Sequence, residues 1–127
     1  MGAAYALLDQ ARGILAEARR EAAAGERYSL AHRAALRTAA ALFAERGRPA
    51  STRRRLVSAW VLLDSVAPEF ARWSRYFSST AQARIAVEAG ATSAVSKLDA
   101  DVHLRMAEEF LFLVEESIEL LVAPKAS

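Results

Sequence analysis

Apolar side chains recur every three or four residues along most of this chain, a spacing that predicts helices with one buried face. About a quarter of the residues are alanine, which favours helix and lets facing helices approach closely. The connections between the apolar stripes are short. The sequence therefore predicts an all-α fold, an up-and-down bundle of four to five helices.

Turn and cap residues indicate where these helices begin and end. Gly25 is placed to end the first helix, and Gly47 with the following Pro49 ends the second. Pro68 suits the first turn of a helix, and the triplet Ser78–Thr80 is expected to weaken that helix further along. We expect helices over residues 4–24, 26–46, 56–66 and 68–89, and a last helix, capped by Asp99 or Asp101, that runs to residue 122.

Length and composition place the chain in a broad class. One hundred and twenty-seven residues suffice for one core, so we expect residues 1–127 to form a single domain. The absence of cysteine excludes disulfides, thiolate zinc sites and thiol nucleophiles. The longest apolar stretch, residues 56–63, is far shorter than the roughly 20 residues of a membrane span, and no export signal is visible. We expect a cytoplasmic protein without membrane association.

Charge is distributed unevenly along the chain, although the net charge is only +2. Residues 1–55 carry eleven arginines against five acids, whereas residues 99–127 carry two basic residues against seven acids. The basic front and the acidic tail can attract each other within a bundle or across a dimer. The asymmetry alone therefore does not require an anionic partner.

The strongest electrostatic feature is an arginine-rich segment after the second predicted helix. Five guanidinium groups within ten residues could contact several phosphates at once and give a salt-sensitive affinity, with Trp60 and Tyr76 stacking nearby. The alternatives are a solvated loop and a loop that pairs with the acidic last helix of a neighbouring copy. The candidate nucleic-acid-binding residues are Arg46, Arg48, Arg53, Arg54 and Arg55.

Both histidines lie on apolar stripes. His32 follows Tyr28 by one helical turn, and His103 lies on the side of Met106 and Phe110. We therefore expect buried imidazoles bonded to polar neighbours rather than metal ligands or catalysts. Two histidines without cysteine make no three-ligand zinc site unless carboxylates join them, so we predict no metal and no cofactor.

The aromatic and acidic clusters have ordinary structural interpretations. Phe70, Trp73 and Phe77 recur at helical spacing, which predicts core positions, with part of the stripe serving as a dimer face if the bundle is small. A solvated face is the interpretation of the glutamates of the last predicted helix, Glu108, Glu109, Glu115, Glu116 and Glu119.

Residues 28–43 resemble the second helix of HEPN domains, in which an aromatic, a small residue and often a histidine precede spaced alanines. Residues 58–69, Trp73 and Asp99-Ala-Asp101 follow in the same order and extend the resemblance over about residues 7–121. The whole looks like the small stand-alone actinobacterial branch. The resemblance implies a helical bundle, often a homodimer, in a family of RNases, toxin–antitoxin components and non-catalytic binders of nucleic acids or nucleotides.

RNases of this family carry an Arg-x(4–6)-His motif late in the domain. His103 has no arginine five to seven positions before it, so that motif is missing. Arg27 and His32 have the spacing, but Tyr28 stands where a polar residue commonly follows the arginine. Five residues along a helix also turn by about 140°, which places the two side chains on different faces.

Our leading prediction is therefore a non-catalytic HEPN-like module, dimeric, whose partner is RNA, DNA or a protein. The alternative is a metal-independent ribonuclease in which His32 moves a proton and Arg27, Arg33 or Arg37 stabilises phosphoryl charge, either within one chain or across a dimer.

Overall fold

The structure is a computed structural model that describes residues 2–47 and 58–122, and every regular element within those ranges is helical. None of these helices is both long and apolar enough to cross a membrane. The elements are α1 (Gly2–Arg20), α2 (Ala24–Arg46), α3 (Ala59–Val66), the 3-10 turn η2 (Pro68–Phe70), α4 (Ala71–Ser79), α5 (Ala81–Glu88), the 3-10 turn η3 (Thr92–Ala94) and α6 (Lys97–Val122).

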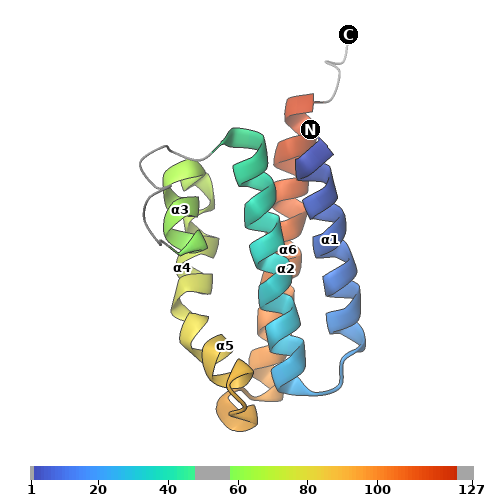
Figure 1. Cartoon of the computed structure of the whole chain (residues 1–127), viewed down its shortest axis with the longest axis vertical. Helices are drawn as coiled ribbons and strands as arrows, with labels where there is room; N and C mark the ends of the chain where they lie inside the picture. The colour runs from blue at the N-terminus through green and yellow to red at the C-terminus, as the bar shows by residue number, and fades with distance from the viewer. Residues whose placement is uncertain (1, 48–57, 123–127) are drawn as a thin grey trace.

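These helices form four columns whose chain direction alternates (Figure 1). The long helices α1, α2 and α6 form three columns, and α2 packs against both of the others. The shorter helices α3, α4 and α5 follow one another along the fourth column. The predicted all-α, up-and-down bundle is confirmed, with one column divided into several helices.

Small side chains bring the long helices together, and rings fill the remaining space. The alanines of α2 that are completely buried, Ala31, Ala34, Ala35, Ala39 and Ala41, leave room for close helix packing. Between α3, α4 and α6 the core is aromatic: Trp60, Phe70, Trp73, Phe77 and Phe110 are all buried and in ring contact. The predicted core positions of Phe70, Trp73 and Phe77 are confirmed.

Glycine has a different role at each of the first two predicted helix ends. The first helix ends at Arg20, so Gly25 is not its cap but lies in the first turn of α2. A Cβ there would lie 3.1 Å from Cγ1 of Val87 on α5, so the glycine permits a close approach. Gly47, in contrast, ends α2 as predicted, with a φ of 83° and its N–H bonded to the Phe43 carbonyl.

The helix predicted over residues 68–89 is broken at Thr80. Pro68 begins η2, as its position suggests, and α4 ends at Ser79 before α5 begins at Ala81. The Thr80 hydroxyl donates to the Tyr76 and Phe77 carbonyls at 3.2 and 3.1 Å. Such hydroxyl bonds compete with the helical ladder, and the weakening expected at this triplet is confirmed.

The prediction that Asp99 or Asp101 caps the last helix is wrong. Ser96 is the cap: its Oγ accepts from the Asp99 N–H at 3.0 Å, and the Asp99 carboxylate accepts from the Ser96 N–H at 2.9 Å. This reciprocal pair is a capping box. The helix predicted over residues 56–66 is observed from Ala59, with Ser58 as its cap, and residues 48–57 lie outside the described part.

Burial on the short helix α3 gives a direct test of this packing. Leu63 is completely buried, whereas Val61 on the same helix is 58% exposed. We expect Leu63→Ala to lower the free energy of unfolding by about 2–5 kcal/mol, because it leaves a cavity. The matched change Val61→Ala should stay within about 0.5 kcal/mol, as measured by urea denaturation. Equal losses in the two variants would contradict this placement of α3.

Candidate functional site

The two histidines meet at the centre of the bundle. His32 on α2 is 1% exposed and His103 on α6 is completely buried, and 3.1 Å separates Nδ1 of His32 from Nε2 of His103. The two rings are nearly parallel. The prediction of buried histidines bonded to polar neighbours is confirmed, and the neighbour of each is the other.

A layer of aromatic rings encloses this pair. Tyr28 stacks on His103 with ring centroids 3.9 Å apart, and Trp60 and Phe77 meet His32 edge-on. The hydroxyl of Tyr76 lies 2.9 Å from Nδ1 of His103. Trp60 is therefore a core residue, not the exposed stacking platform expected beside the arginine-rich segment.

Burial keeps both imidazoles neutral. It lowers the pKa of His32 to about 4, helped by the positive charge of Arg84, and it lowers the pKa of His103 to about 3. A neutral imidazole has one N–H, so His103 donates to one of its two partners and accepts from the other. The Tyr76 hydroxyl, His103 and His32 thus form one hydrogen-bonded chain in which the donors all point the same way along it.

A second polar group ties α5 to α2 beside the pair. The Ser29 hydroxyl donates to the Glu88 carboxylate at 2.8 Å, and Arg84 forms an ion pair with Glu88 at 3.0 Å. The bond from Ser29, and then the charge of Arg84, lower the pKa of the Glu88 carboxyl. Sequence reasoning did not identify this cluster, because its residues come from different helices.

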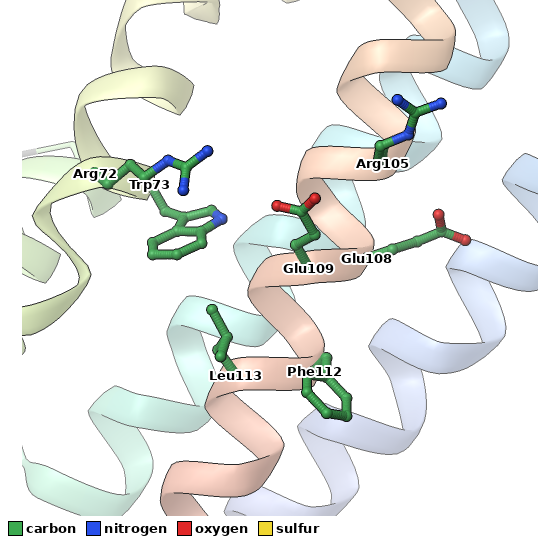
Figure 2. Close-up of a pocket in the computed structure, with 7 residues that line it drawn as sticks. All are labelled: Arg72, Trp73, Arg105, Glu108, Glu109, Phe112 and Leu113. Atoms are coloured by element: carbon green, nitrogen blue, oxygen red, sulfur yellow. The ribbon is translucent and has the colours of Figure 1, made fainter.

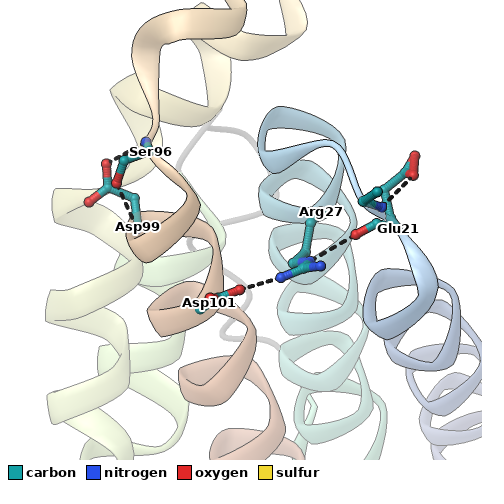
Figure 3. Close-up of polar contacts among 6 residues, drawn as sticks. Glu21, Arg27, Ser96, Asp99 and Asp101 are labelled. Carbon is teal, nitrogen blue, oxygen red and sulfur yellow. Dashed lines mark hydrogen bonds and ion pairs between the residues drawn. The ribbon is translucent and has the colours of Figure 1, made fainter.

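Arg27, which the ribonuclease alternative places with His32, faces other groups (Figure 3). Its guanidinium forms an ion pair with Asp101 on α6 and donates to the Glu21 carbonyl at 2.9 Å. These two contacts hold the connection between α1 and α2 next to α6.

The other two arginines considered with His32 also point elsewhere. Arg37 donates to the side chain of Gln10 at 3.0 Å, and Arg33 is exposed on α2. None of these three arginines therefore pairs with His32, and the arginine whose charge acts on that ring is Arg84 on α5. Neither imidazole faces solvent here, whereas a general base must reach its substrate.

Of the arginine-rich segment, only Arg46 lies among the described residues. Its guanidinium is 2.7 Å from the Glu69 carboxylate and 3.2 Å from the Ser117 hydroxyl, so it joins the end of α2 to η2 and α6. This contact lowers the pKa of the Glu69 carboxyl. The other predicted nucleic-acid contacts, Arg48, Arg53, Arg54 and Arg55, lie outside the described residues.

Two of the glutamates of α6 hold α1 in place. Glu115 bonds Arg12 at 2.5 Å, and Glu108 bonds Arg19 at 2.5 Å. The attraction expected between the basic front and the acidic tail thus operates within the bundle. Among the described residues, no group of three histidine, aspartate or glutamate side chains is placed to hold a metal ion.

The outer side of α6 carries a continuous exposed stripe. Its members, spaced alternately by four and three residues, are Leu98, Val102, Arg105, Glu109, Phe112, Glu116 and Glu119, and we call it the α6 stripe. Three of the five large apolar side chains exposed on the described surface belong to it: Leu98 at 71%, Val102 at 40% and Phe112 at 59%. No ion pair or hydrogen bond joins its four charged members to another described residue.

A groove of about 420 Å³ lies between the α6 stripe and α4 (Figure 2). Arg72 and Trp73 form its α4 wall, and the Arg72 guanidinium lies 5.2 Å from the Trp73 ring. Leu113 points from α6 toward Trp73, and Arg105 and Glu109 stand on the α6 side. Phe112 borders both this groove and another one between α6 and α1. The feature of the sequence that could have indicated this surface is Phe112, an apolar residue among the glutamates of the last helix.

Acidification is expected to destabilise the fold through the histidine pair. Both histidines have a pKa below the ordinary 6.5, so the unfolded chain binds protons between about pH 6.5 and 4 that the folded chain does not. The contribution to stability is complete above pH 6.5 and falls below it by about 1.4 kcal/mol per pH unit for each histidine.

Urea denaturation of the wild-type chain and His103→Gln across this range measures the effect. The variant lacks one of the two titrating groups, so its stability should decline less steeply with falling pH, whatever its stability at neutral pH. Parallel profiles would contradict a buried, neutral His103.

Comparison with known proteins agrees with the helical architecture. A family model of SAV_6107-like HEPN domains matches residues 18–115, a span that contains both histidines and most of α6. No curated protein and no solved structure matches the chain. Because the family model covers well over half of the sequence, this chain belongs to the HEPN family.

Proposed function

We propose that this HEPN bundle is a non-catalytic protein-interaction module that forms a homodimer through the α6 stripe and the groove beside it. The observation that carries the proposal is Phe112, which is 59% exposed on the rim of an apolar-floored groove. Single exposed apolar residues are common on protein surfaces, but an exposed aromatic residue at the edge of an apolar groove is typical of an interface.

The charged members of the stripe support the same surface. Arg105, Glu109, Glu116 and Glu119 are exposed and have no ion pair within the described chain, although Arg12 and Arg19 nearby are paired. Unpaired charges around an apolar centre favour a specific partner and orientation.

The non-catalytic part of the proposal is supported by the two histidines. Each is enclosed by core side chains and bonded to the other, and each has its pKa well below neutral. A ribonuclease that used His32 would have to expose it by opening the helices around it.

Replacing Phe112 is expected to weaken the dimer. Phe112→Ser removes the largest exposed apolar side chain of the stripe and should weaken dimerisation about tenfold or more. Val61→Ser is the matched control, because Val61 is equally exposed, at 58%, but lies on α3. Sedimentation equilibrium measures both variants. A wild-type monomer at high concentration, or equal dimerisation of wild-type and Phe112→Ser, would contradict the proposal.

Nucleic-acid binding through the arginine-rich segment is the second candidate function, favoured by five arginines in ten residues. If it holds, the triple variant Arg53→Ala/Arg54→Ala/Arg55→Ala should bind with a weaker salt dependence. The slope of log affinity against log salt concentration should fall by the equivalent of about two to three phosphate contacts, because each arginine displaces counterions. Titration of labelled single-stranded RNA, single-stranded DNA and duplex DNA at two salt concentrations measures this.

The matched control for that titration is Arg20→Ala/Arg33→Ala/Arg75→Ala, which removes the same charge from three exposed arginines on α1, α2 and α4. Equal losses in the two triple variants would make the binding non-specific. The RNA recovered from each mixture is run on a gel and should be intact. Shortened RNA that His32→Ala abolishes would favour the ribonuclease instead.

A further inference from the structure

We infer that the two copies pair their α6 helices in antiparallel orientation, with Phe112 of each copy in the groove of the other and Arg105 of each facing Glu116 of the other. This inference rests on the proposed self-association and specifies its register. It is carried by the sequence of charges along the α6 stripe and by the position of the groove on it.

Charge determines the orientation of the two helices. The first half of the α6 stripe holds Leu98, Val102 and Arg105, and its acids, Glu109, Glu116 and Glu119, follow later. A parallel pair would place each of these glutamates beside the same glutamate of the other copy. Like charges opposite each other are unfavourable. An antiparallel pair brings the basic residue of one helix to the acids of the other.

The groove determines the register. Its α6 wall is centred near Glu109, between Arg105 and Leu113, and its opposite wall is Trp73. A benzyl side chain that enters it comes from a residue opposite Glu109. When Phe112 of the second copy takes that position, the residue four further along, Glu116, faces the residue four earlier in the first copy, Arg105.

This register satisfies both copies at once. A two-fold axis makes each contact occur twice, so one arrangement buries two Phe112 side chains and forms two Arg105–Glu116 pairs. The Trp73 and Leu113 side chains that line the groove supply the apolar contact for Phe112. The Arg72 and Arg105 guanidinium groups at its edges face the acidic half of the second helix.

A register shifted by seven residues also aligns the two stripes. It places Phe112 of one copy against Val102 of the other and Arg105 against Glu109. In that register Phe112 lies beyond the groove, whose α6 wall begins at Arg105. The two registers therefore differ in the acid that faces Arg105, and charge reversal distinguishes them.

The test measures the dimerisation constant by sedimentation equilibrium for Arg105→Glu, Glu116→Arg and Glu109→Arg, alone and in pairs. Arg105→Glu and Glu116→Arg alone should each weaken the dimer about tenfold or more, because each places like charges together twice. An equimolar mixture of these two variants restores both opposite-charge pairs and should return to within about threefold of the wild-type constant. Circular dichroism of each variant checks that the helices are retained.

The outcomes separate this inference from the proposed function. Rescue of Arg105→Glu by Glu116→Arg supports the register, whereas rescue by Glu109→Arg or by neither overturns it. A wild-type dimer that is sensitive to Phe112→Ser but shows no rescue leaves the proposed function standing and overturns the register alone. A wild-type chain that stays monomeric overturns both.

Discussion

The contact between His32 and His103 joins α2 to α6 in the middle of the bundle, and the arrangement of the core follows from it. Two polar rings can be buried this deeply only when their nitrogens find partners, since an unpaired buried donor costs about 1–3 kcal/mol. Tyr76 supplies the third member of the chain from α4, and Tyr28, Trp60 and Phe77 close around it. A core organised in this way uses the histidines for packing.

Much of this core could be predicted from the sequence, because burial follows from periodicity. His32 and His103 lie on apolar stripes, and a stripe states which face of a helix is buried. It does not state which faces meet, so the contact between residues 71 positions apart could not be foreseen. Gly25 was misread for a related reason: a glycine near a helix end serves equally as a cap or as the point where another side chain, here Val87, approaches closely.

For the charged residues too, the sequence predicts which face they occupy but not which partners they meet. The glutamates of α6 were predicted to form a solvated face, which describes Glu109, Glu116 and Glu119 but not Glu108 and Glu115, whose carboxylates hold Arg19 and Arg12 on α1. A helical repeat places all five on the outside, and only the packing of α1 selects which two are paired. The Arg27–His32 spacing turns the helix by about 140°, which separates the two side chains. The structure directs Arg27 to Asp101 instead.

The helix α6 therefore has two organised faces. Its inner face carries His103, Phe110 and Val114, which the core requires, and its outer face repeats the same three- and four-residue spacing with Val102, Arg105 and Phe112. The exposed Phe112 ring adds nothing to the packing of the monomer, although single exposed apolar residues are common on protein surfaces. The charges on that face also differ along the helix, because Arg105 precedes Glu109, Glu116 and Glu119. A charged partner is therefore attracted more strongly in one orientation than in the other. Shape and charge on the outer face of α6 are the two features on which the proposed antiparallel pairing with a second copy rests.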